Sequence, residues 1–195
     1  MKTRKYDMGA RQQAKCATRE SIIAAAIDSF MAERSFAVTL PAIADRAGVT
    51  VKTVLRHFGS RDALLDAACA QVYDEVEAER RIVSVDPEAA LRVLLNHYER
   101  RGLVALAMLS EENDPRALRM TAAGKLGHRE WVEEVFAAQL PASGEARSRL
   151  VDVLVVATDV YAWKLLRLDR GLSVDEVHDR MAMMTAALLE SGVKP

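Results

Sequence analysis

The scarcity of helix-breaking residues constrains the fold of this chain more than any other sequence feature. Only 5 prolines and 9 glycines occur in 195 residues, of which 50% are hydrophobic and 28% are charged. Ala, Leu, Glu and Arg, all good helix formers, are among the most frequent residues. No alternation typical of strands stands out. The sequence therefore predicts an all-α protein of one or two domains.

Apolar spacing and capping residues place the helices. Ile22, Ile23, Ala26 and Phe30 recur at helical spacing, which predicts a first helix from about Thr18, as its N-cap, to residue 34. Thr39, Thr50, Ser60 and Ser173 are further predicted caps, and Glu176 completes a capping box with Ser173. The other helices are predicted at about 40–47, 51–58, 61–80, 87–101, 103–112, 115–139, 145–169 and 173–191.

Charge is distributed unevenly along the chain. Residues 1–61 carry 11 Lys and Arg against 5 Asp and Glu, whereas residues 62–195 carry 16 against 23. A basic first third joined to an acidic remainder indicates a module that faces nucleic acid, although chance variation of surface charge is an open alternative. We expect a flexible basic arm at 1–17, a DNA-binding domain at 18–61 and a ligand-binding and dimerisation domain at 62–195.

The most informative stretch is TLPAIADRAGVTVKTVLRHFGSRDALL, residues 39–65. Ile43 and the small Ala44 lie on the predicted second helix. Gly48 supplies the backbone freedom of a short turn, and Val49 is expected to fill the corner between two helices. Any pair of helices joined by a glycine turn shows part of this pattern. The preceding amphipathic helix and the basic residues nearby favour a helix-turn-helix.

The third predicted helix has one apolar face and one polar face. Val54 and Phe58 share a face and should pack inward, which leaves the opposite face to interact with a partner. That outer face comprises Val51, Lys52, Thr53, Arg56 and His57. A helix with a capped N-terminus and short polar or cationic side chains is suited to the major groove of DNA.

Residues 18–65 resemble the DNA-binding domain of the TetR family of bacterial repressors. The pattern of that family is T-x-x-x-I-A-x-x-A-G-V-S-x-x-T-x-Y-x-H-F-x-S-K-x-x-L after an amphipathic helix. The matching residues are Thr39, Ile43, Ala44, Ala47, Gly48, Val49, Thr50, Thr53, His57, Phe58, Ser60, Arg61 and Leu64. The resemblance implies that Thr39, Thr50, Thr53, His57 and Arg61 hold phosphates. It also implies that Val51, Lys52 and Thr53 face base edges, with Arg56 able to do either.

Three residues depart from the family pattern. Ser35 stands where glycine is usual after the first helix, and Leu55 stands where the family has a tyrosine. Val51 replaces a residue that is commonly polar, and its side chain is able to contact a thymine methyl group. The operator sequence of a relative therefore does not carry over to this chain.

The last two predicted helices, about 145–169 and 173–191, are apolar over more than one stripe. A helix that is apolar nearly all round is buried on two sides, and the second side is expected to meet a partner subunit. One thick monomeric core is the alternative. The family resemblance implies a homodimer through these helices, and two recognition helices one DNA turn apart would read a palindromic operator.

Apolar and aromatic residues between 87 and 139 suggest a pocket for a small apolar effector. The candidate lining residues are His97, Tyr98, Met108, Met120, His128, Trp131 and Tyr161. The same residue types are equally typical of an ordinary core. The expected function is thus a ligand-responsive DNA-binding regulator, most simply a repressor that the effector releases from DNA.

A small all-α enzyme and a protein-binding helical adaptor are the competing interpretations. The four histidines lack the spacing of metal ligands, and neither a glycine-rich phosphate loop nor a nucleophile elbow is present in the sequence. We therefore expect no enzyme activity, no metal and no cofactor. Cys16 and Cys69 lie far apart in the sequence, and no signal-peptide or membrane-length apolar segment stands out, so a cytoplasmic location is expected.

Overall fold

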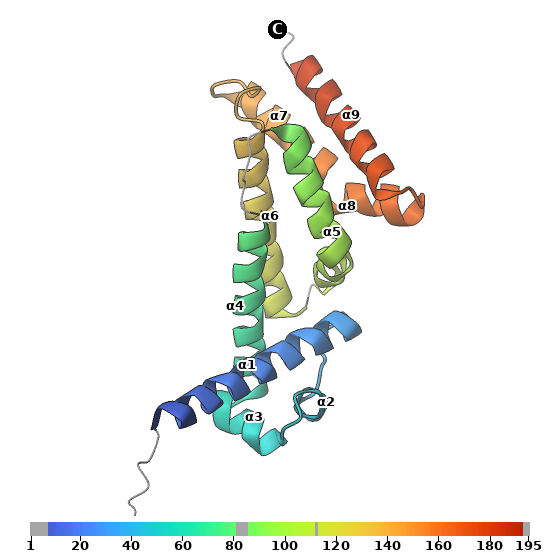
Figure 1. Ribbon diagram of the computed structural model, residues 1–195. Helices are drawn as coiled ribbons and strands as arrows, with labels where there is room; N and C mark the ends of the chain where they lie inside the picture. The colour runs from blue at the N-terminus through green and yellow to red at the C-terminus, as the bar shows by residue number, and fades with distance from the viewer. Residues whose placement is uncertain (1–7, 81–85, 112, 193–195) are drawn as a thin grey trace, which may run out of the picture. The chain divides into compact units, whose positions relative to one another are not determined.

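The computed structural model describes residues 8–80, 86–111 and 113–192, and these residues form helices joined by turns and loops. No β-strand occurs in these ranges, so the predicted all-α fold class is confirmed. The elements, shown in Figure 1, are α1 (Met8–Glu33), α2 (Leu40–Arg46), α3 (Val51–Phe58), α4 (Arg61–Arg80), α5 (Pro87–Ser110), α6 (Pro115–Val135), α7 (Glu145–Thr158), α8 (Val160–Trp163), the π-helix η1 (Lys164–Asp169) and α9 (Val174–Gly192).

Side-chain caps begin several helices where the sequence predicts them. The Thr39 hydroxyl accepts a hydrogen bond from the Ala42 amide at the start of α2, and Ser60 accepts one from Ala63 at the start of α4. At α9, the Glu176 amide donates to the Ser173 hydroxyl, and the Ser173 amide donates to the Glu176 carboxylate. This reciprocal pair is the predicted capping box, which satisfies amides that the first helical turn leaves without partners.

Helix α1 begins at Met8 rather than at Thr18. Residues 8–17, predicted as part of a flexible arm, are therefore helical, while residues 1–7 lie outside the described ranges. Thr18 does not cap the helix, because its hydroxyl donates to the carbonyl of Ala14 one turn earlier. The physical reason is propensity: the segment from Ala10 to Ala17 consists of good helix formers with Cys16 as its weakest member, and nothing in it stops a helix.

A single helix, α5, replaces the two helices that were predicted to meet near Gly102. Gly102 is buried, and a Cβ atom at this position would lie only 2.5 Å from Cζ3 of Trp163. The glycine therefore permits close packing against an aromatic ring and does not interrupt the helix. Sequence reasoning assigned the residue to a break because both uses of glycine look alike in a sequence.

The predicted helix over 145–169 is interrupted at Asp159. This residue has extended backbone angles, φ −71° and ψ 158°, and its carboxylate accepts from the Tyr161 amide to cap α8. The preceding Thr158 bonds through its hydroxyl to the Leu154 carbonyl. Threonine and aspartate side chains that bond to nearby backbone compete with the regular helix, which explains the break.

The chain divides into two compact units, residues 1–74 and 75–195, with the division inside α4. In the first unit, Ile22, Ala26, Ile43, Val54 and Leu64 are among the residues buried between α1, α2, α3 and the first turns of α4. In the second unit, α5, α6, α7 and α9 surround an apolar core. None of the described helices is both long and apolar enough to cross a membrane.

Candidate nucleic-acid interface

Helices α2 and α3 form a helix-turn-helix whose turn depends on Gly48. This residue has a φ of +66°, and its amide donates to the Asp45 carbonyl. The next amide, that of Val49, donates to the carbonyl of Ala44 at 3.0 Å. A Cβ atom on Gly48 would meet nothing within 4 Å, so the left-handed backbone conformation, not space, favours glycine at this turn.

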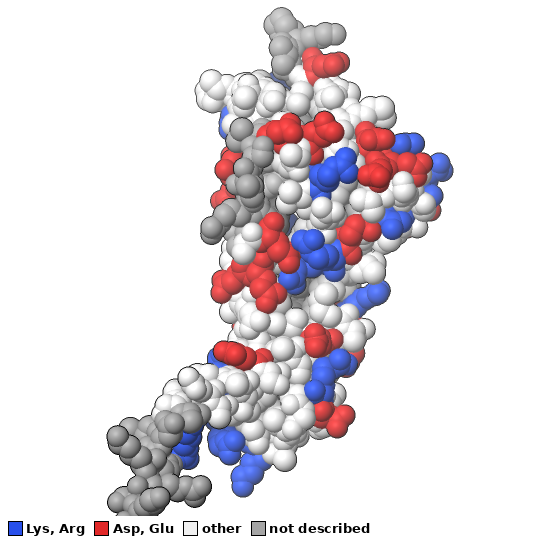
Figure 2. All heavy atoms as spheres, viewed as in Figure 1, with Lys and Arg blue, Asp and Glu red and all other residues white. Residues whose placement is uncertain are grey.

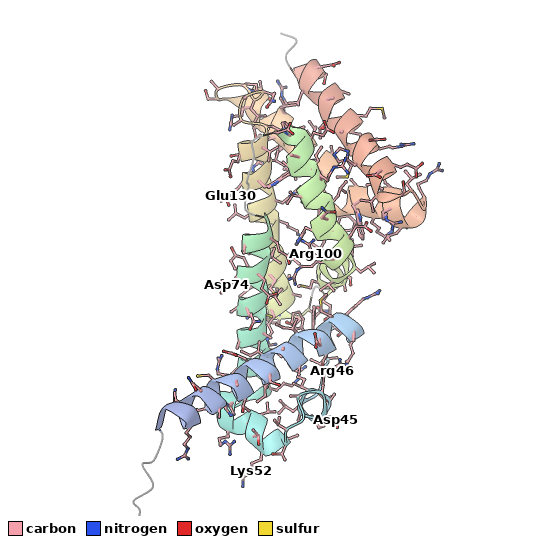
Figure 3. The ribbon with its side chains drawn as sticks, viewed as in Figure 1. Asp45, Arg46, Lys52, Asp74, Arg100 and Glu130 are labelled. Atoms are coloured by element: carbon pink, nitrogen blue, oxygen red, sulfur yellow. The ribbon has the colours of Figure 1, made fainter. Side chains whose placement is uncertain are left out.

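Helix α3 buries one face and exposes the other, as the sequence predicts. Val54 is fully buried, whereas Lys52 and Arg56 are exposed. Figure 3 shows Lys52 pointing away from α1 and α2. Val51 and Thr53 are half-buried at the margin of this exposed face. The second helix of the motif therefore carries two exposed cations, Lys52 and Arg56, on the side opposite to the core.

The N-terminus of α3 is held by two threonines. The Thr50 hydroxyl accepts from the Thr53 amide at 3.2 Å, and the two hydroxyl oxygens lie 3.0 Å apart. Thr39 caps α2 in a similar way. A capped helix N-terminus presents its remaining amides and the positive end of the helix dipole to solvent, which favours an anion such as a phosphate.

His57 lies at the C-terminal end of α3 in an electropositive setting. Its Nδ1 atom is buried and has no hydrogen-bond partner among the residues that the structure describes. Burial lowers the pKa of His57, and the nearby charges of Arg56, Lys15 and Arg19 lower it further. The ring is therefore held in its neutral form, with Nδ1 as the nitrogen that most easily goes without a proton.

Arg61 has a structural role that the sequence did not reveal. Its Nε atom donates to the Val38 carbonyl at 2.7 Å, and an Nη atom donates to the Phe36 carbonyl. Both carbonyls belong to the segment that leads from α1 to α2. Arg61 thus joins the start of α4 to the residues just before the Thr39 cap. Its predicted contact with phosphate stays a prediction.

In the second unit, three of the predicted ligand-binding residues lie around Thr158. The Tyr98 hydroxyl donates to the Thr158 carbonyl, and Nε2 of His128 lies 3.1 Å from the Thr158 hydroxyl. The His128 ring stacks on Trp131 with its centroid 5.7 Å from that of the indole. Sequence reasoning missed Thr158, whose position in the middle of an apolar helix was the available signal.

Of the other four predicted ligand-binding residues, His97 adjoins this cluster, because its ring centroid lies 5.8 Å from that of Tyr98. His97 is buried and contacts the Glu79 carboxylate, whereas Tyr161 is exposed. Met108 and Met120 are half-buried on α5 and α6. A separate cavity of about 460 Å³, lined by the first turn of α5, Phe136 and one face of α9, contains none of the seven predicted residues.

A network of charges at the end of α4 was also missed. The Arg101 guanidinium donates to Glu79 and Glu75, and Arg100 and His97 contact Glu79 as well. These hydrogen bonds, that of Arg101 foremost, lower the pKa of Glu79 from 4.5 to about 2. The residues are separated by about twenty positions in sequence, so only the folded chain brings them together.

Within residues 8–80, 86–111 and 113–192, no group of three or more His, Cys, Asp and Glu side chains is arranged to hold an ion.

Both the sequence and the fold of this chain are similar to those of known proteins. Residues 22–68 match the family model of the bacterial regulatory proteins, tetR family. The crystal structure of a transcriptional regulator from Rhodococcus sp. Rha1 is similar over 91% of this chain and 99% of that chain, with a TM-score of 0.68 and 19% sequence identity. At this level of identity the likeness shows a shared fold. None of the curated proteins compared with the chain matches it.

A helix-turn-helix with an exposed basic face, in a segment that matches this family model, is the architecture of a DNA-binding transcription regulator. The matched residues 22–68 overlap the segment 18–65 whose motif predicts this resemblance. The helix-turn-helix segment of this chain is thus similar to that of the bacterial regulatory proteins of the tetR family.

Proposed function

We propose that this regulator is a repressor that binds a palindromic double-stranded operator as a homodimer and leaves it when a small apolar effector binds. The observation that carries the proposal is the exposed face of α3, where Lys52 and Arg56 stand opposite the buried Val54. In this proposal residues 18–61 bind DNA, and residues 62–195 bind the effector and the second subunit in the cytoplasm.

Each residue of the DNA-binding surface has a proposed role. Val51, Lys52 and Thr53 on the first turn of α3 face base edges in the major groove. Arg56 contacts either a base or a phosphate, because its side chain is long and exposed. Phosphates are held by the residues at the helix ends, namely Thr39, Thr50, Thr53, His57 and Arg61.

His57 adds a constraint on how a phosphate is held. Because its pKa is lowered and its Nδ1 atom is buried without a partner, the neutral ring would offer a hydrogen bond from Nε2. Such a contact positions the DNA backbone without a full positive charge. The salt-dependent part of the affinity would then come from charged side chains and not from His57.

Exposed apolar side chains support dimerisation through the last helices. Val156 on α7 is 70% exposed, Leu165 on η1 58%, and Met183 on α9 66%. Large apolar side chains that remain this exposed in one chain are typical of a surface that a partner covers. We propose that the segments 145–169 and 173–191 of two copies pack together, which pairs two α3 helices on one operator.

The proposed effector site is less sharply defined. Tyr98, His128 and Trp131 lie together around Thr158 in the second unit, where an aromatic wall and polar atoms adjoin an apolar core. This setting supports a small, largely apolar ligand with one or two polar groups. Because the polar atoms already bond to one another, a ligand would have to replace one of these hydrogen bonds.

Selection of bound fragments from a random duplex library, at fixed salt, tests the proposal. We expect a palindromic motif and two chains per duplex. Lys52→Ala should weaken binding to the selected sequence by about 5- to 150-fold, the range for loss of one base contact, and should weaken binding to unselected DNA much less. Lys125→Ala, which removes an exposed cation of α6, is the matched control.

The outcomes separate clearly. A palindromic motif whose recognition falls only in Lys52→Ala supports the placement of α3 in the major groove. Equal affinities of the wild type, Lys52→Ala and Lys125→Ala for the selected duplex would refute that placement. The effector is tested separately. Candidate compounds are screened for dissociation of the protein–DNA complex, and their binding to the second unit is followed by the fluorescence of Trp131 and Trp163.

A further inference from the structure

The inward-facing stripe of α1 changes its chemistry halfway along the helix. Ile22 and Ala26 on this stripe are fully buried in the first unit. One and two turns earlier, at spacings that keep to the same face, stand Arg19 and Lys15, and both side chains are exposed. The stripe that packs the core in the second half of α1 is therefore cationic in the first half.

The cationic half of the stripe lies beside the recognition helix. The guanidinium carbon of Arg19 sits 4.9 Å from the ring centroid of Phe58, the last residue of α3. Lys15 is one turn farther from the core, and Figure 1 shows this end of α1 extending past α3. Arg19 and Lys15 are also close enough to His57 to act on its charge.

Packing accounts for only part of this arrangement. The stack on Phe58 is a sufficient structural role for Arg19, since a cation over an aromatic face is favourable. Lys15 has no such role: among the described residues it has no ion pair, hydrogen bond or ring contact. Lys15 and Arg19 thus lie toward the C-terminal end of α3, a helix that itself carries Lys52 and Arg56. Figure 2 shows several Lys and Arg side chains, in blue, on the part of the surface where α1 and α3 lie.

We propose that Lys15 and Arg19 bind phosphates of the DNA backbone next to the groove occupied by α3, and so form a second DNA contact. This inference rests on the proposed function and adds to it a site outside the helix-turn-helix. Like charges gathered on one rigid helix repel one another, and a polyanion relieves that repulsion. The contact is to phosphates and carries no sequence information of its own.

A helical platform differs physically from a flexible arm. An arm that becomes ordered on DNA loses conformational entropy when it binds, whereas side chains on a helix that is already formed lose only rotamer freedom. Lys15 and Arg19 are therefore placed to add affinity at every sequence that the protein visits, and their contribution should be fully electrostatic.

The salt dependence of DNA binding tests this second contact. Each phosphate contact contributes about 0.9 to the slope of log K against log salt, so Lys15→Gln should lower the slope by about 0.9 and the double variant with Arg19→Gln by about 1.8. The loss should be the same for the selected operator and for unselected duplex. Lys125→Gln on α6 should leave the slope unchanged.

Two further measurements keep the test decisive. Lys15→Gln removes no contact within the protein, so its result stands even where Arg19→Gln loosens the packing on Phe58. An operator duplex shortened by stages at its ends should remove the difference between wild type and Lys15→Gln once the contacted phosphates are gone.

A slope in Lys15→Gln equal to that of the wild type, while Lys52→Ala still loses operator affinity, would overturn this inference and leave the proposed function standing. A wild-type protein that binds no duplex even at low salt would overturn both. A loss confined to the selected operator would also overturn the inference, because it would mean that these residues contact bases.

Discussion

Arg61 distinguishes a phosphate contact predicted by the motif from a structural contact that the fold reveals. Its side chain is one-third exposed, and its donors reach the carbonyls of Val38 and Phe36. Arg61→Met keeps the length of the side chain and removes every donor. If the structural role dominates, the variant should loosen the segment before α2 and the helices that pack beside it.

The magnitude follows from two hydrogen bonds to a charged group. Each is worth about 1.5–3 kcal/mol when buried, and partial exposure lets water replace some of that energy. We therefore expect Arg61→Met to lower the stability of the first unit by about 2–4 kcal/mol. At about 1.4 kcal/mol per factor of ten, amide exchange in α1 and α2 should accelerate by roughly 30- to 700-fold.

Hydrogen exchange read by mass spectrometry is the suitable assay, because Trp131 and Trp163 both lie in the second unit and their fluorescence does not report on the first. Arg56→Met is the matched control, since it removes an exposed arginine of α3 and should leave exchange unchanged. Unchanged exchange in Arg61→Met, together with a salt slope of DNA binding reduced by about 0.9, would refute the structural role and support the phosphate contact.

Two further predictions concern the second unit. Gly102→Ala places a Cβ atom against the ring of Trp163 and should lower the free energy of unfolding by about 1–3 kcal/mol, measured by urea unfolding with tryptophan fluorescence. Gly124→Ala is the control, because a Cβ atom there meets nothing within 4 Å and should not destabilise the unit, and equal urea midpoints for the two variants would contradict the packing argument. The pKa of Glu79 is lowered to about 2 by its hydrogen bonds, chiefly to Arg101, so its stabilising effect is complete above about pH 4.5 and is lost as the pH falls toward 2. Glu79→Gln should unfold more easily at neutral pH and lack this part of the acid dependence, and parallel pH profiles for the two proteins would show that the network adds no stability.

The local features of the fold were predictable from sequence because they depend on neighbouring residues. The caps Thr39, Thr50 and Ser173 act within three residues of themselves, and the turn at Gly48 requires only a backbone that tolerates positive φ. The exposed face of α3 follows from the position of Val54, because helical periodicity places Lys52 and Arg56 away from it. Family resemblance and physical chemistry agreed on this segment.

Helix boundaries depended on a balance that sequence patterns resolve poorly. Thr18 was predicted to start α1 because threonine is a good cap, yet the helix formers before it extend the helix to Met8. Gly102 was predicted to end a helix, yet a ring from another helix occupies the space beside it. In each case one residue type serves two roles, and its distant neighbours decide which role applies.

Sequence alone determined the helical class, the helix-turn-helix and the exposed surface of α3, because each arises from interactions within a few residues. Tertiary structure decided the partners of Arg61, the network of Glu79 and Arg101, and the position of Lys15 beside α3. These contacts join residues that lie about twenty to forty positions apart. Local helix propensity does not predict such pairs, because they form only when packing brings their helices together.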